Sequence, residues 1–165
     1  MIGAIAGDIA GSCHEQANLK RMNFQLYSKN SRFTDDTVMT VAVMDCLLTH
    51  RSYNESFRDW GRRYPDRGYG GMFRKWLVDD EMGPYNSFGN GSAMRVSPIG
   101  FAFHRLKDVL AEAERSALPS HNHPEGIKGA QTVAATVFLA RKGKDKSAIR
   151  DYIESEFGYR LRGSI

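Results

Sequence analysis

Cysteine is scarce in this sequence, and the positions of the two cysteines argue against two kinds of stabilising site. Among 165 residues only Cys13 and Cys46 are present, far apart and not in a CxxC pair. A structural zinc site needs four ligands at characteristic spacing, and a disulfide framework needs several cysteine pairs. The sequence therefore argues against zinc and against a disulfide framework, and it favours the reducing cytoplasm as the location.

Long apolar runs are also missing. No stretch reaches the roughly 20 apolar residues that a transmembrane helix requires. The segment 1–7 is apolar like the centre of a signal peptide, but it lacks a positively charged start, and Asp8 interrupts it. We therefore expect neither a membrane anchor nor a secretion signal.

Acidic residues are slightly fewer than basic ones, with 19 Asp and Glu against 23 Lys and Arg, which gives a net charge of +4. This excess favours anionic ligands such as nucleotides and diphosphates, although it is also typical of an ordinary solvated surface. No recognised nucleic-acid motif accompanies the basic residues. We therefore do not expect nucleic-acid binding.

Strict alternation of apolar and polar residues is absent, and helical periodicity dominates instead. A chain of this length can form one compact core, so we predict a single all-α domain over residues 1–165. Loops are expected at 64–71, 83–91 and 119–124. We predict helices over residues 35–49, 54–63, 72–80, 106–118, 125–141 and 146–157.

Two further helix predictions depend on glycine and proline. Gly3, Gly7 and Gly11 recur every fourth residue, so on a helix they would share one face that a neighbouring backbone can approach closely. We expect this helix to be central and tightly packed. Residues 92–96 are predicted to open another helix, which Pro98 bends or restarts.

The most informative stretch is Thr34-Asp35-Asp36-Thr37, which precedes the apolar run 38–44. A Thr or Asp at a helix start is explained by capping alone. Capping needs one such residue, however, and two adjacent carboxylates repel each other unless a cation lies between them. Oxygen donors of this kind suit Mg²⁺ or Mn²⁺. From the residues alone, capping and metal binding are both open.

Glu15 follows the small-residue segment and would lie at the carboxyl end of a helix, where the helix dipole disfavours a negative charge. Such a carboxylate suggests a metal or an arginine as its partner, and plain solvent exposure is the alternative explanation.

Two loops contain candidate binding residues. Residues 87–92, Ser-Phe-Gly-Asn-Gly-Ser, lead into an expected helix start, whose free N–H groups can bind an anion such as a diphosphate. Gly-Asn-Gly also forms an ordinary turn, and from the residues alone the turn is the favoured interpretation. His121 and His123 resemble a metal pair, but a zinc site would need two further ligands. They are otherwise surface residues, with His121 as a candidate for ligand contact.

Taken together, these segments resemble the ADP-ribosylglycohydrolase family, the relatives of dinitrogenase reductase-activating glycohydrolase. The order and spacing of the segments match, and the likeness covers essentially the whole chain. No single motif is unique, but the ordered set is specific. The resemblance is carried by residues 2–11 with Glu15, 32–37, 89–95, 120–121 and 129–130.

The resemblance implies an all-α fold that holds two Mg²⁺ ions in a cleft. There ADP-ribose would be hydrolysed from an arginine or serine side chain or from a small molecule. Thr34, Asp35 and Asp36 would be metal ligands. Glu15 would lie at the metal site and help to gate the substrate, so that Glu15, Asp35 and Asp36 form the catalytic set.

The substrate-binding residues implied by the resemblance lie in the two loops. The loop residues would contact the diphosphate and ribose, and the histidine would contact the distal ribose. The set comprises Ser87, Phe88, Gly89, Asn90, Gly91 and His121.

The sequence departs from the family in one respect. The family has a second metal motif, Asp-x-Asp-Thr, near its carboxyl terminus, and no such motif occurs here. We therefore expect a carboxyl-terminally truncated homologue that binds Mg²⁺, or Mn²⁺, weakly and incompletely and has weak or lost activity. The alternatives are an inactive, enzyme-derived protein that sequesters an ADP-ribose-like ligand or inhibits a protein partner, and a hydrolase completed by another chain.

Loss of the carboxyl-terminal helices would also expose apolar side chains. We expect such a face to be covered in a homo-oligomer or by a protein partner. Its expected members are Ile5, Ile9, Val38, Val41 and Met44.

Overall fold

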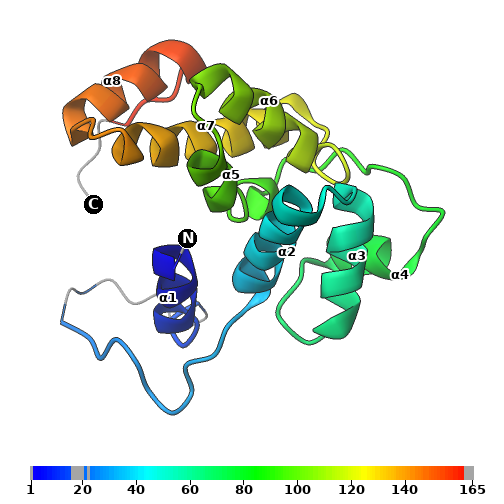
Figure 1. Cartoon of the computed structure of the whole chain (residues 1–165). Coiled ribbons are helices and arrows are strands. Elements are labelled where there is room, and N and C mark those ends of the chain that lie inside the picture. Colours follow the sequence, from blue (N-terminus) through cyan, green and yellow to red (C-terminus); the bar gives the residue numbers. More distant parts are fainter. Residues whose placement is uncertain (1, 16–20, 22, 162–165) are drawn as a thin grey trace. The chain divides into compact units, whose positions relative to one another are not determined.

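The computed structural model describes residues 2–15, 21 and 23–161, and in that part of the chain every regular element is a helix (Figure 1). The prediction of an all-α fold is confirmed. The chain divides into two compact units, Met1–Met82 and Gly83–Ile165, and each is described by itself. Whether the two units form a single domain stays a prediction. Among the described helices, none has the length and hydropathy needed to cross a membrane.

The first unit contains α1 (Ile2–Gly11), α2 (Asp35–Thr49), α3 (Tyr53–Arg63) and α4 (Gly71–Val78). Helix α2 contacts α1 and α3, and α3 contacts α4. The apolar run in α2 predicted a helix buried on several sides. This is confirmed, because Val38, Met39, Ala42 and Val43 are at most 2% exposed.

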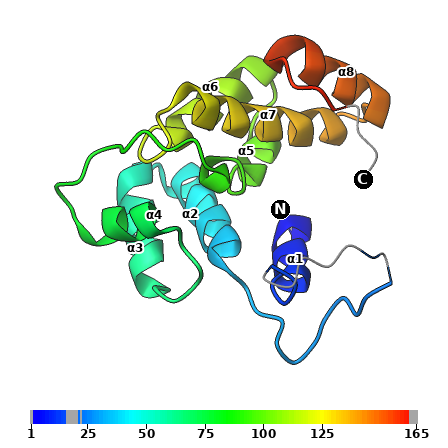
Figure 2. The same ribbon diagram turned by 180° about the vertical axis from the view of Figure 1, so that it is seen from behind.

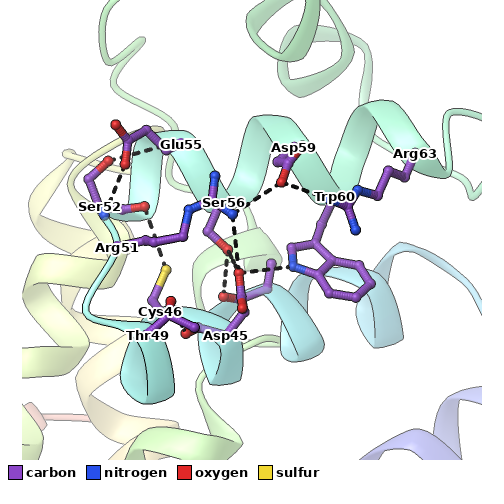
Figure 3. A network of polar contacts seen from close by, with 11 residues as sticks. Asp45, Cys46, Thr49, Arg51, Ser52, Glu55, Ser56, Asp59, Trp60 and Arg63 are labelled. Carbon is purple, nitrogen blue, oxygen red and sulfur yellow. Dashed lines mark hydrogen bonds and ion pairs between the residues drawn. The ribbon is translucent and has the colours of Figure 1, made fainter.

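Helix α3 is fixed to α2 by polar contacts (Figure 3). A capping box between Ser52 and Glu55 sets its first turn. The Ser56 hydroxyl lies 2.9 Å from the Ala42 carbonyl oxygen and 3.2 Å from Asp45, and the Trp60 indole N–H donates to the same Asp45 carboxylate. Asp45 therefore holds two turns of α3 against α2.

The expectation of a central α1 is wrong. Helix α1 has no buried residue, and a Cβ added at Gly3, Gly7 or Gly11 would meet nothing within 4 Å. Its main contact in the first unit is with α2. Small residues allow a close approach of another backbone but do not require one, and the described residues do not use this glycine face for packing.

The expected exposed apolar face is also partly wrong. Val38 is buried within the first unit. It lines a small cavity of about 140 Å³ together with aromatic residues that include Trp60 and Tyr64. Ile5, Ile9, Val41 and Met44 are half-buried.

The second unit contains η1 (Asn90–Ser92), α5 (Ser97–Ala102), α6 (Leu106–Ala117), α7 (Pro124–Arg141) and α8 (Lys146–Phe157). Helix α7 runs the length of this unit and contacts α5, α6 and α8 (Figure 1, Figure 2). Gly100 allows α5 to lie against α7, since a Cβ there would be 2.8 Å from the Ala134 carbonyl oxygen. The predicted bounds of α6, α7 and α8 agree with the structure within one residue.

The predicted helix over residues 92–96 is wrong. This stretch is the end of a single 3₁₀ turn followed by turns, and α5 starts only at Ser97, with Pro98 in its first turn. Proline disfavours a helical residue before it and is well accommodated in a first turn, so it starts the helix here rather than bending it.

Candidate functional site

Three carboxylates gather in the first unit. Asp8 comes from α1, Glu15 from the turn after α1, and Asp36 from the first turn of α2. One carboxylate oxygen from each lies within 4.8 Å of the others. Asp8 and Asp36 are half-buried and Glu15 is exposed. Together with Gly7, Gly11 and His14 they line an open recess of about 390 Å³.

The position of Asp8 is set by the start of α2. Its carboxylate accepts hydrogen bonds from the Thr34 N–H at 2.8 Å, the Thr34 hydroxyl at 2.6 Å and the Thr37 N–H at 3.3 Å, and from the Thr37 hydroxyl. The first N–H groups of a helix have no partner within the helix, and the positive end of its dipole favours a carboxylate. Asp8 therefore joins α1 to α2.

The structure gives Thr34 a capping geometry. Thr34 is 6% exposed. Its hydroxyl donates to the Asp8 carboxylate and accepts a hydrogen bond from the Asp36 N–H at 3.3 Å. Asp35 is not part of the three-carboxylate group. Its N–H donates to the Arg67 carbonyl at 2.7 Å, and its carboxylate oxygen would lie 3.2 Å from a Cβ at Gly68. Of the expected metal ligands, the structure places only Asp36 in the group with Glu15.

The electrostatics of the group favour a cation. Burial raises the pKa of Asp36, and the negative charges of Asp8 and Glu15 raise it further. Burial, followed by the charge of Asp36, raises the pKa of Asp35 to about 6. These carboxylates repel one another in the folded chain, and a cation bound between them would relieve that repulsion. Carboxylate oxygens are the ligands that hard divalent cations prefer.

Asp8 is the residue of this carboxylate group that the sequence did not single out as a candidate. The available signal was that it is the only charged residue in α1. It also precedes Glu15, a carboxylate that the sequence did single out, by only seven residues.

A second constellation lies in the second unit, where residues 86–92 run beside residues 120–126. The Ser87 N–H donates to the Ser120 carbonyl at 3.3 Å, and the Asn86 N–H donates to the Asn122 side chain at 2.7 Å. The Ser92 hydroxyl donates to the Gly126 carbonyl at 2.7 Å. These bonds hold the two loops together and define the surroundings of His121.

His121 is buried, contrary to the surface position expected for a loop histidine. It is 4% exposed, its Nδ1 lies 2.7 Å from the Ser120 hydroxyl, and its Nε2 would lie 2.8 Å from a Cβ at Gly91. Burial, and then the positive charge of Arg95, lowers the pKa of His121 to about 4. The imidazole is therefore neutral at pH 7.

The other predicted substrate residues have different surroundings. Phe88 is 74% exposed and its ring lies against His123, with 5.3 Å between centroids. Gly89 precedes η1, which Asn90 starts. The expected helix amino terminus is wrong, because η1 has three residues and is not continued. His123 caps α7 by accepting from the Glu125 N–H.

Similar sequences occur among known proteins. A sequence model of the ADP-ribosylglycohydrolase family matches residues 1–162. ADP-ribosylhydrolase ARH3 of Bos taurus is 33% identical over 146 residues, which cover 77% of this chain and 40% of the bovine protein. The Homo sapiens protein of that name is 30% identical over 182 residues, covering 89% of this chain and 50% of the human protein.

A bacterial relative, uncharacterized protein YegU of Escherichia coli K12, is 26% identical over 153 residues, which cover 82% of this chain and 46% of YegU. This chain thus spans about half the length of the relatives described here. Because the family match covers nearly all of its residues, the chain belongs to the ADP-ribosylglycohydrolase family.

Proposed function

We propose that this chain binds a divalent cation, Mg²⁺ or Mn²⁺, through Asp8, Glu15 and Asp36, and that it serves the hydrolysis of the glycosidic bond between ADP-ribose and an acceptor. The acceptor would be an amino-acid side chain or a small molecule. The observation that carries the proposal is the approach of three carboxylates to within 4.8 Å of one another.

The donor set fits such a cation. All three side chains offer oxygen, and none offers the sulfur or imidazole ligands that would favour zinc or copper. Thr34 and Asp35, the ligands expected from the resemblance, adjoin Asp36 in the chain and are proposed as additional donors.

The residues of the cluster have separable roles in the proposed reaction. When bound, the cation would neutralise the carboxylates and help to position the ribose hydroxyls and a water molecule. Glu15 is exposed and is therefore the carboxylate that a substrate can reach first. Asp36 is held in the first turn of α2 and would orient a water molecule at the recess. Carboxylates near the anomeric carbon would stabilise the oxocarbenium-like state of glycosidic cleavage.

ADP-ribose is the proposed ligand of the second constellation. Ser87, Gly89 and Asn90 would contact the diphosphate and ribose, and His121 would contact a ribose. Support comes from the hydrogen bonds that hold residues 86–92 beside residues 120–126, from Nε2 of His121, which has no hydrogen bond within the described residues, and from relatives named ADP-ribosylhydrolase.

Titration calorimetry with Mg²⁺ and Mn²⁺ tests the cation site. We expect one weak site in the wild-type chain and at least a tenfold weaker one in Asp36→Asn, because one of the three carboxylates loses its charge. Glu81→Gln, which neutralises an exposed carboxylate in the turn at residues 79–82, is the matched control and is expected to bind as the wild type does. Equal binding by Asp36→Asn and Glu81→Gln would contradict the proposal.

Binding and turnover of ADP-ribose compounds test the reaction. We expect ADP-ribose to raise the melting temperature, because a ligand of the folded state stabilises it. Release of ADP-ribose from arginine-linked and serine-linked peptides, with and without Mn²⁺, then measures hydrolysis. The assignment is refuted when ADP-ribose causes no thermal shift and no ADP-ribose is released from the peptides in the presence of Mn²⁺.

A further inference from the structure

A chain of buried polar contacts leads from Arg95 to His121. Arg95 is 1% exposed, and its Nη2 donates to the Ser116 carbonyl at 2.6 Å and to the Ser120 hydroxyl at 3.3 Å. Ser120 is fully buried, and its hydroxyl oxygen lies 2.7 Å from Nδ1 of His121. The three side chains therefore form one connected series.

The direction of the hydrogen bonds in this series follows from the chemistry of the groups. A guanidinium has donors and no acceptor, so the Ser120 oxygen must accept from Arg95. A hydroxyl oxygen can accept twice, so this bond alone does not fix the direction at Nδ1. Within the described residues, however, the Ser120 hydroxyl has no acceptor other than Nδ1 of His121, and its hydrogen therefore points there. A neutral imidazole whose Nδ1 accepts carries its proton on Nε2.

We propose that Arg95 and Ser120 are positioning residues that hold His121 as the neutral tautomer protonated on Nε2. The second unit then presents one fixed N–H donor at its loop surface. This part of the inference rests on the proposed function: the Nε2–H group donates to an oxygen of ADP-ribose, either a ribose hydroxyl or a phosphate oxygen.

The Nε2 atom of His121 is available to such a partner because it has no hydrogen bond within the described residues. Within the described residues, His121 makes its hydrogen bond through Nδ1, and Nε2 has none. The neighbour of Nε2 is Gly91, where any side chain would collide with the ring at 2.8 Å.

Groups around the ring disfavour a second proton on it. Arg95 is the charged group whose field acts on His121, and it opposes the imidazolium form. The Tyr85 ring lies 6.2 Å from the imidazole, centroid to centroid, and burial raises the pKa of its hydroxyl to about 12, so it stays neutral. His121 is therefore a donor rather than an acid or a base at neutral pH.

Nitrogen-15 NMR of the intact, ligand-free chain decides the tautomer without reference to activity. We expect the His121 spectrum at neutral pH to show a protonated Nε2 and an unprotonated Nδ1. We expect Ser120→Ala to give a mixture of both tautomers, because the hydroxyl that fixes Nδ1 is gone. Ser116→Ala is the matched control, since it removes a second fully buried hydroxyl that bonds to the Ala113 carbonyl instead.

Titration with ADP-ribose then tests the role of the donor. We expect Ser120→Ala to raise the dissociation constant about tenfold and Ser116→Ala to leave it within about twofold. A wild-type His121 protonated on Nδ1, or an unchanged tautomer in Ser120→Ala, would overturn the inference. Should Ser120→Ala fail to fold, the wild-type spectrum still decides. A correct tautomer without any ADP-ribose binding would instead overturn the proposed function.

Discussion

At the residue scale, His121 makes the stability of this chain depend on pH. Its pKa is lowered to about 4 from 6.5 by burial and by Arg95. Between these two values the unfolded chain binds a proton that the folded chain does not. The contribution of His121 to stability is therefore complete above pH 6.5 and is lost as the pH falls towards about 4.

Chemical denaturation measures this effect. Between about pH 7.5 and about pH 5, we expect the free energy of unfolding of the wild type to fall by about 2 kcal/mol more than that of His121→Gln. His104→Gln, which changes an exposed histidine, is the control and is expected to follow the wild type. Parallel pH profiles for the wild type and His121→Gln would show that the imidazole is not held neutral.

Single residues also mark the limit of what the sequence could predict. The Thr-Asp-Asp-Thr pattern identified a helix start correctly because capping is local. The approach of Asp8 to that start was not predictable, because it joins residues 26 positions apart through a tertiary contact. Whether Thr34, Asp35 and Asp36 bind metal stays a prediction.

At the scale of elements, the close approach of α7 to the two loops depends on one glycine. A Cβ at Gly126 would lie 2.6 Å from the Ser87 carbonyl oxygen and 2.9 Å from that of His121. Both are backbone atoms, which cannot rotate away. Gly129, one turn later on the same helix, would place its Cβ 3.8 Å from Ala93, an ordinary contact distance.

This difference gives a paired prediction. We expect Gly126→Ala to lower the free energy of unfolding by about 2 kcal/mol and to weaken ADP-ribose binding, because the loops must separate. We expect Gly129→Ala to leave stability unchanged or to raise it by roughly 0.5 to 1 kcal/mol through helix propensity. Urea denaturation of both variants is the measurement. Equal stability of the two would mean that residues 87 and 121 do not pack on α7 this closely.

The elements themselves were largely predictable from the sequence. The bounds of α8 agree fully with the predicted range, and those of α3, α6 and α7 agree within one residue, because periodicity, caps and breakers are encoded locally. The lack of buried residues in α1 was not predictable. The glycine spacing shows that another backbone could approach this helix face closely, but it contains no information about whether a neighbour does so.

At the scale of the whole molecule, self-association stays a prediction that rests on the half-buried apolar residues of α1 and α2. We expect light scattering to give a mass near that of two chains, because half-buried apolar side chains gain free energy when a second copy covers them. Met44→Asp is expected to shift the mass to one chain. Val78→Asp, at a residue that is 72% exposed at the end of α4, is the control. A wild type that behaves as a single chain would exclude this interface.

The open glycine face of α1 has a thermodynamic consequence for cation binding. Ten residues with three glycines and no buried side chain form a helix of low intrinsic stability. Asp8 and Glu15 come with this segment, so local unfolding of α1 would remove two of the three carboxylates from Asp36. A cation held at the proposed site by all three carboxylates would bind only the docked helix, and its apparent affinity would be reduced by the fraction of molecules in which α1 is undocked.

Helix propensity and ion affinity are therefore linked. Gly3→Ala adds a methyl group that meets nothing within 4 Å and favours the helix. We expect it to tighten Mn²⁺ binding in calorimetry and to slow amide hydrogen exchange in α1, although residue 3 lies outside the proposed donor set. A bound cation would in turn stabilise the helical form of α1. The fraction of α1 that is folded would therefore increase with the occupancy of the cation site.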